Sequence, residues 1–310
     1  MQTARAVRRD GGGCVEIIIG VNPDSLDNDA FALGSNLALL LKADVVLAHI
    51  FPTSFDYPSA AHVDVEWRSF VEREAEQLIA EAKERFCRVW GWSPEQVTTV
   101  IAGNRSSGKG LVQVAERRGS DMIVIGAAPN AASGRFVIGS TADKLLHSAG
   151  VPVAVAPAGY ARTRQGEVGK IVVCFQNTAE SRRTLSTAAD YSARTGVPLE
   201  VLTILLRHRI YASNLGADAE GPMLASLRDD AAAAVAETLA NSGADVQVES
   251  TTVTADSVQA AMERTEWEGD ELLVMGSAVS GPVRRVFLGD MTYKLLRSTP
   301  VPAIVLPRHD

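Results

Sequence analysis

The stretch Asp121-Met122-Ile123-Val124-Ile125-Gly126 decides the fold, because it returns about 150 positions later as Glu271-Leu272-Leu273-Val274-Met275-Gly276. Each copy is followed, at the same distance, by a glycine, which is Gly139 or Gly289, and then by a Lys-Leu-Leu step. Both copies close on a similar Pro-containing apolar segment, residues 151–157 and 301–307. Unrelated segments would not keep one register over so many features, so the pattern predicts a duplicated domain.

Length and composition agree with two domains. A chain of 310 residues is long enough for two units that each bury their own core. The formal charge of -7 argues against nucleic acid as a partner, because a phosphate backbone needs a basic surface. Cys14, Cys87 and Cys174 show no C-x-x-C spacing and no histidine at ligand distance, which argues against a disulfide framework and a structural zinc site.

Targeting and membrane signals are missing from the sequence. Residues 1–13 carry arginines but no apolar core of signal-peptide length, and we expect them to form a loose tail. No later run approaches the roughly 18 apolar residues that a bilayer span needs. We therefore expect a soluble, cytoplasmic protein that has no membrane partner.

Apolar runs without alternation, typical of strands covered on both faces, take turns with segments of helical spacing. In the first copy this pattern predicts strands at 15–21, 45–50, 97–102, 122–125 and near 153. Helices are predicted around 30–40, 71–89, 111–117 and 141–148. Strands that alternate with helices in this way form a parallel sheet with helices on both faces. Each copy is therefore predicted to be an α/β domain with a doubly wound, five-stranded parallel sheet.

The second copy repeats this order, with strands predicted at 171–175, 199–205, 246–251, 272–275 and 303–305. The glycines and charges of residues 157–169 predict a linker, which gives domains at 14–157 and 169–307. Residues 209–222 are less regular, and we expect a loop there.

A candidate ligand site follows the fourth strand of the first copy. In doubly wound sheets ligands bind beyond the carboxyl ends of the strands, and here the chain reads Gly126-Ala127-Ala128-Pro129, nine further residues, and Gly139-Ser140-Thr141. Glycine lets the backbone approach a ligand, the amides of a helix start favour an anion, and hydroxyls can donate to phosphate oxygens. The pattern predicts a phosphate cradle. The alternative is a plain strand-to-helix connection that Ser140 or Thr141 caps.

These features together resemble the universal stress protein family in its tandem form. The family signature is Gly, two residues, Gly, nine residues, Gly and then Ser or Thr; Gly126, Gly139 and Ser140 match it, and Pro129 stands at the second glycine. The Ala-His-Ile of residues 48–50 and the closing Val-Pro-Val strand of residues 151–153 match as well. The resemblance implies a Rossmann-like fold of the adenine nucleotide alpha hydrolase type in each half.

The resemblance also implies a function. The family contains members that bind ATP and members that do not, so it implies a stress-response protein that is no enzyme, or at most a weak ATPase. The ligand would be ATP or another adenine nucleotide, with or without Mg²⁺. The last strands, residues 151–156 and 301–306, would join the halves as an intramolecular pseudo-dimer, and two such chains could associate as a homodimer.

The family's binding positions carry over to the first copy one at a time. Asn22 stands where the first strand usually ends in an aspartate, and it keeps a carbonyl acceptor without the charge. Ile50 stands where a backbone group meets the adenine. The phosphates would lie against Gly126, Gly139, Ser140 and Thr141, while Pro129 removes one amide donor. Arg135 is either an exposed loop residue or a phosphate contact.

The second copy departs further from the family pattern. Gln176 replaces the strand-end aspartate, Val279 replaces the second glycine, and Asp290 follows Gly289 in place of a hydroxyl. A carboxylate at a phosphate cradle repels a polyphosphate, although Asp290 could also serve as a helix cap. Both interpretations predict that the second domain is a scaffold with a degenerate site.

Two alternatives come from other classes of protein. The segment from Gly103 to Lys109 satisfies the spacing of a P-loop NTPase, yet Gly110 stands where a Ser or Thr should bind Mg²⁺, and the bland interpretation is a flexible turn. The other alternative is a signalling scaffold without nucleotide. No catalytic or metal-binding constellation stands out, and His49 and His147 are expected to be a strand-end and a surface histidine.

Overall fold

The computed structural model describes residues 15–22, 28–53, 63–128, 136–163, 167–207, 220–277 and 290–307. The predicted tail at 1–13 and the loop residues Pro129, Arg135 and Val279 lie outside these ranges, as does most of the loop predicted at 209–222. Within these ranges no helix combines the length and the apolarity that crossing a membrane requires.

All five strands and all four helices predicted for the first half are present. They are β1 (Glu16–Gly20), α1 (Asn28–Leu41), β2 (Asp44–Phe51), α2 (Val63–Trp90), β3 (Val97–Gly103), α3 (Ser107–Arg118), β4 (Met122–Gly126), α4 (Ser140–Ser148) and β5 (Val153–Ala156).

The second half repeats this order. Its elements are β6 (Lys170–Phe175), α6 (Ala179–Thr195), β7 (Leu199–Leu206), α8 (Glu220–Ser242), β8 (Val248–Ala255), α9 (Val258–Arg264), β9 (Glu271–Gly276), α10 (Asp290–Ser298) and β10 (Ala303–Leu306). Strand β8 begins and ends later than predicted, and the last three residues of the loop expected at 209–222 belong to α8.

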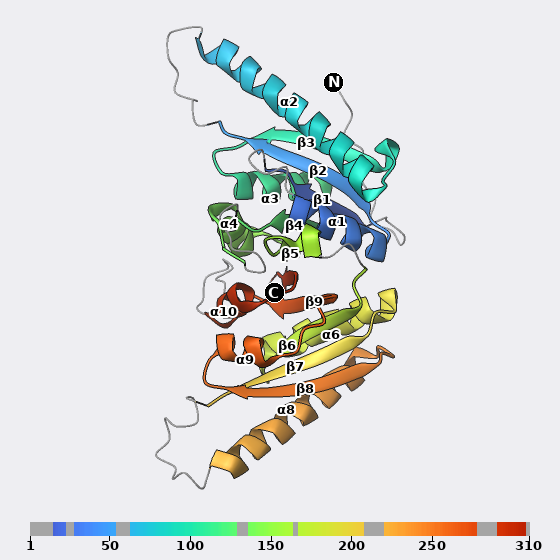
Figure 1. Cartoon of the computed structure of the whole chain (residues 1–310), viewed down its shortest axis with the longest axis vertical. Coiled ribbons are helices and arrows are strands. Elements are labelled where there is room, and N and C mark those ends of the chain that lie inside the picture. Colours follow the sequence, from blue (N-terminus) through green and yellow to red (C-terminus); the bar gives the residue numbers. More distant parts are fainter. Residues whose placement is uncertain are drawn as a thin grey trace.

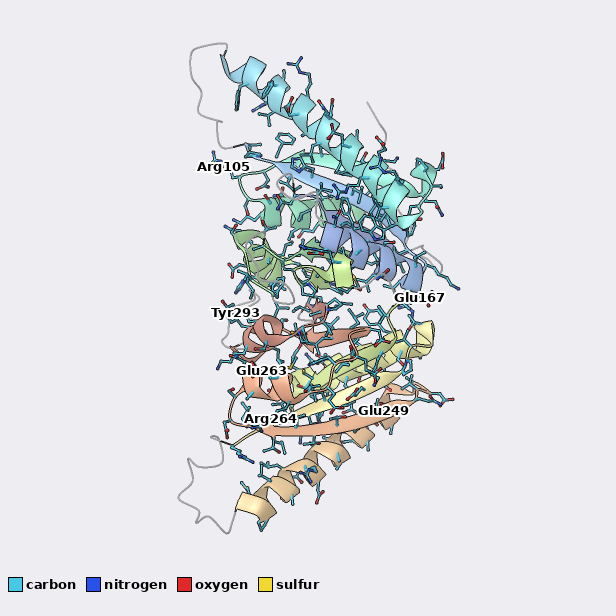
Figure 2. All side chains as sticks on the ribbon, viewed as in Figure 1. Arg105, Glu167, Glu249, Glu263, Arg264 and Tyr293 are labelled. Atoms are coloured by element: carbon cyan, nitrogen blue, oxygen red, sulfur yellow. The ribbon has the colours of Figure 1, made fainter. Side chains whose placement is uncertain are left out.

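The strands form one ten-stranded sheet in the order β3-β2-β1-β4-β5-β10-β9-β6-β7-β8. Pairing is parallel within each half, but β5 and β10 pair antiparallel, with Ala154 opposite Ile304. The predicted pairing of the two last strands is thus confirmed, and we call the β5–β10 pair the seam (Figure 1). The sheet ends at β3 and at β8, the strand that carries Glu249 (Figure 2).

Each face of the sheet is covered by its own set of helices. Helices α1, α2, α6 and α8 pack on one face around a core that includes Phe31, Phe86 and Leu185. Helices α3, α4, α9 and α10 pack on the other, around Leu145 and Leu296. In Figure 1, α4 and α10 lie at the left of the molecule, and α1 and α6 lie to the right of them, over the other face of the sheet. Burial on both faces explains why inner strands such as β1 and β4 read as continuous apolar runs.

Equivalent positions in the two halves follow from the strand register. Ile17 lies opposite Val45 and Met122, and Ile171 lies opposite Leu199 and Leu272, so Ile17 and Ile171 are equivalent. The same sequence offset relates Lys42 to Gly196, which end the two equivalent helices with φ angles of 52° and 76°. Positions on α1 and α6 can therefore be compared residue by residue.

The predicted linker is not irregular throughout, because it contains the short helix α5 (Tyr160–Thr163). The carboxylate of Asp29 accepts hydrogen bonds from the amides of Gly159 at 2.7 Å and Ala161 at 2.8 Å. Tyr160 is buried, and its hydroxyl accepts from the side chain of Asn36 at 3.1 Å. The linker therefore packs on α1 before the chain crosses to the second domain near Glu167 (Figure 2).

Candidate functional site

A cavity of about 220 Å³ lies at the carboxyl ends of β1, β2 and β4, beside the start of α4. Six of the seven residues predicted from the sequence line it: Asn22, Ile50, Gly126, Gly139, Ser140 and Thr141. The seventh, Pro129, lies outside the described residues. Sequence reasoning missed the other lining residues, which are Gly20, Val21, Ala48, Ser107, Leu111, Ile125, Ala127, Ala128 and Ala142. The fold thus brings together segments that are more than a hundred residues apart in the sequence.

The start of α4 faces this cavity without a side-chain cap. Gly139 is the N-cap residue and, being a glycine, has no side chain that could bond to the amides of the first turn. The expectation that Ser140 or Thr141 caps the helix is wrong, because both are already helical. A helix start without a capping side chain offers amide donors and the positive end of the helix dipole. With two hydroxyls beside them, these amides can accept an anion.

Gly139 itself is not required by the backbone or by packing. Its φ of -80° and ψ of 172° suit any residue, and an added Cβ would meet only the Cβ of Ala128, at 3.4 Å. Neither an unusual backbone conformation nor close packing inside the protein therefore requires a glycine at this position. A glycine at the rim of a cavity is useful when a bound molecule approaches the backbone.

The end of β1 is held in place by β2. The amide of Val21 donates to the carbonyl of Ala48 at 2.8 Å, and Nδ1 of the buried His49 lies 3.1 Å from the carbonyl oxygen of Val21. His49 is thus a buried strand-end histidine, and its contact fixes the backbone next to Asn22. His147 lies on α4, 3.4 Å from the carboxylate of Asp143.

The described lining residues include no ionisable side chain. They supply no carboxylate for a metal, no general base and no nucleophile paired with one, and no three of the described His, Cys, Asp or Glu residues form a cluster that could hold a metal. The walls are apolar at Ile50, Leu111 and Ile125, which suits a flat nucleobase. The volume is below the roughly 300–1,000 Å³ of sites that enclose a whole drug-sized ligand, so a nucleotide would extend from the mouth.

The second domain has an equivalent cavity of about 370 Å³ with a different lining. Gln176 lines it at the position of Asn22, Cys174 replaces Gly20, and Met291 replaces Thr141. At the position of Ala142, the Thr292 hydroxyl donates to the carbonyl of Gly276 at 2.8 Å. Helix α10 begins at Asp290, whose side chain, like Val279, is not among the described groups. The second cavity therefore has a thioether where the first has the Thr141 hydroxyl, and a thiol where the first has Gly20.

The thiol in the second cavity should be unreactive in the folded protein. Burial raises the pKa of Cys174 to about 12, so the thiolate that attacks alkylating reagents is scarce near pH 8. We expect iodoacetamide to modify Cys174 only after unfolding in urea, as followed by peptide mass spectrometry. Equal rates in native and unfolded protein would mean that the second cavity is open to reagents of this size.

The segment with P-loop spacing has a structural role. The Asn104 side chain accepts from the amide of Ser106 at 3.0 Å, and Ser106 is the N-cap of α3. A Cβ on Gly108 would lie 2.8 Å from the carbonyl oxygen of Thr141, so this glycine lets α3 pack closely on α4. Lys109 is exposed and is not among the residues that line the cavity. The segment therefore positions α3 beside the cavity and contributes Ser107 to its lining, whereas Lys109 does not take part.

Comparison with known proteins agrees with the duplicated fold. The sequence model of the Universal stress protein family matches residues 16–157 and again 167–307. A universal stress protein of Mycobacterium tuberculosis is 30% identical over 292 residues, which cover 94% of this chain and 99% of that protein. The crystal structure of a universal stress protein from Archaeoglobus fulgidus superposes with a TM-score of 0.63 at 15% identity, covering 95% of this chain and 98% of that one. The chain belongs to the universal stress protein family, in its tandem two-domain form.

Proposed function

We propose that this protein binds one molecule of ATP, or another adenine nucleotide, in its first domain and responds to it without turning it over efficiently. The observation that supports the proposal is the convergence of six predicted positions on one cavity at the uncapped start of α4. The absence of ionisable side chains among the described lining residues favours binding over catalysis.

Each group in the first cavity has a part in this proposal. The amides at the start of α4 and the hydroxyls of Ser140 and Thr141 would donate to phosphate oxygens. The backbone at Ile50 and the apolar wall beside it would take the adenine. Since no cation is among the described lining residues, Mg²⁺ on the phosphates would lower their charge, with Asn22 and hydroxyl oxygens as additional hard donors.

The direct test is to ask whether the protein carries nucleotide. We expect mass spectrometry of the supernatant of the denatured protein, and calorimetry of the stripped protein with ATP and Mg²⁺, to give one equivalent of adenine nucleotide per chain. A preparation without nucleotide that also gives no heat with ATP would favour the signalling scaffold without ligand.

The stoichiometry tests the difference between the domains. A carboxylate at Asp290 would repel a phosphate by about 1 kcal/mol when solvated, and Met291 removes a donor that Thr141 supplies. We expect Asp290→Ser to create at most weak binding, because Cys174 and Gln176 remain. Ser140→Asp should abolish binding in the first domain. Two equivalents of ATP with similar affinity in calorimetry would contradict this account.

The exposed Lys109 separates this proposal from a P-loop NTPase. In a P-loop the lysine contacts the β and γ phosphates, and its loss removes nucleotide binding. Because Lys109 lies outside the cavity here, we expect Lys109→Ala to leave the Kd for ATP within about twofold of the parent value. A large loss of affinity in calorimetry would support the P-loop alternative.

A further inference from the structure

Sulfur-bearing side chains gather in the second cavity. Cys174, Met275 and Met291 all line it, and they come from the end of β6, the end of β9 and the first turn of α10. The described lining of the first cavity contains no sulfur. The chain has three cysteines and six methionines, and the fold brings three of these residues, from distant parts of the sequence, to one cavity.

The strand register places Cys174 beside Met275. Strands β6 and β9 pair in parallel with Val173 opposite Val274, so the next residue of each strand, Cys174 or Met275, continues the same register. Both side chains belong to the core on the α4 and α10 face of the sheet. Because neighbouring strands lie about 4.8 Å apart, the two side chains are within contact range.

The first domain supports this placement, because Gly20 and Ile125 hold the equivalent positions there. A Cβ added to Gly20 would lie 3.3 Å from Cγ2 of Ile125. A side chain at the first position therefore meets the side chain at the second.

Met291 is brought to the same side of the sheet by its neighbour in α10. The Thr292 hydroxyl donates to the carbonyl of Gly276 at 2.8 Å, which ties the first turn of α10 to the residue that follows Met275. Met291 packs against the core that contains Cys174 and Met275. The three sulfur-bearing side chains thus converge from three different elements.

The fold itself does not require sulfur at these positions. Their equivalents in the first cavity are Gly20, Ile125 and Thr141, which line a cavity of the same architecture without a thiol or a thioether. The difference between the two cavities is therefore one of chemistry, and it favours a different ligand in each.

The lining of the second cavity suits a soft metal ion. Thiolate and thioether sulfurs are ligands that select Cu(I). No histidine is among the described lining residues, and besides Cys174 the ionisable ones are Glu180 and Arg183, one of each sign, on α6. Helix α6 packs on the opposite face of the sheet from the three sulfur-bearing side chains.

The charge of the thiolate favours a monovalent ion. Burial raises the pKa of Cys174 to about 12, because a bare thiolate would be a desolvated negative charge. A monovalent cation that replaces the thiol proton forms a neutral unit with the thiolate, and the two thioethers add no charge. A divalent cation would leave a net positive charge beside the same apolar core.

We propose that the second cavity binds one Cu(I) ion through the sulfur atoms of Cys174, Met275 and Met291. On binding, the S–H bond of Cys174 breaks, a sulfur–copper bond forms and the proton passes to solvent, while copper and sulfur keep their oxidation states. This site is independent of nucleotide binding in the first domain.

The test is competition for Cu(I), in the absence of oxygen, between the full chain and the chromophoric chelator bicinchoninate. We expect the chain to withhold one equivalent of copper. Loss of even an outer-shell partner lowers metal affinity about 10–100-fold, so Cys174→Ser should weaken binding at least about 100-fold, and Met275→Leu and Met291→Leu at least about tenfold each. Leucine keeps the volume of methionine, and thermal melting will show that each variant is folded.

Met122→Leu and Cys87→Ser are the matched controls, because Met122 is buried in β4 of the first domain and Cys87 lies half-buried on α2. Both should leave the Cu(I) affinity within about twofold of the parent value. Ser140→Asp, which should abolish ATP binding, should also leave Cu(I) binding unchanged. The proposal fails if the parent withholds no copper, if folded Cys174→Ser binds like the parent, or if Cys87→Ser loses the site. It also fails if both Met275→Leu and Met291→Leu bind like the parent, because the thioethers would then take no part.

Discussion

Gly139→Val is expected to weaken ATP binding at least about 100-fold, equivalent to about 2.7 kcal/mol, while the protein stays folded. The new Cβ meets only Ala128 at 3.4 Å, and the extended backbone at this position suits valine, so stability should change by less than about 1 kcal/mol. The two added methyl groups would instead occupy the space that phosphate oxygens need beside the first turn of α4. Calorimetry with ATP and Mg²⁺ gives the affinity, and urea unfolding gives the stability.

Gly150 offers the matched control for this substitution. It lies just beyond the other end of α4, and an added Cβ there would meet nothing within 4 Å. Gly150→Val should therefore leave both ATP affinity and stability close to those of the parent. Parent-like affinity in Gly139→Val would remove the start of α4 from the nucleotide site, even if ATP binds elsewhere.

Ile304→Asp is expected to lower the free energy of unfolding by at least about 4 kcal/mol. Ile304 is 2% exposed, lies opposite Ala154 in the seam and belongs to the core beneath α1 and α6. The change loses the burial of a large aliphatic side chain and places a carboxylate where it has no partner. Such a loss is a large part of the stability of an ordinary domain. Urea unfolding followed by circular dichroism measures it.

Ile304→Val keeps the seam apolar and should lower the free energy of unfolding by only about 0.5–1.5 kcal/mol. Comparing the two variants separates the effect of lost side-chain volume from the effect of a buried carboxylate. If Ile304→Asp unfolds at the same urea concentration as the valine variant, the seam contributes little, and the two halves are held together by other contacts.

The fold could be predicted well from the sequence because residues that are close together in the chain mark most of its strands and helices. Ile17, Ile18 and Ile19 form an unbroken apolar run since both faces of β1 are buried, and such runs are visible without a structure. Helix α5 was missed because its support is not local. Its first amides bond to Asp29, which lies 130 residues earlier in the chain, and nothing in residues 157–169 reveals that partner.

The candidate site was likewise predicted only in part. Gly126, Gly139 and Ser140 can be recognised from their spacing in the sequence, but Gly20 and Leu111 line the cavity only because strands and helices converge there. That Cys174 takes the position of Gly20 in the second domain can be read from the sequence once the strand register of the two halves is known. The cavity of about 720 Å³ between α6 and the starts of β1, β4 and β5 could not be predicted, because it depends on how the second half packs against the first across the seam.

Joining the two halves in one chain has a consequence for how they can diverge. A tethered partner is present at an effective concentration in the range of millimolar for short linkers, so the seam forms at any dilution of the protein. The anchoring of α5 to Asp29 shortens the free tether further. Two identical single-domain subunits must change together when their gene mutates, whereas these halves change separately and always meet in fixed proportion. One half can therefore exchange the Thr141 hydroxyl for the Met291 thioether, or gain the carboxylate of Asp290, while every molecule retains the other half intact.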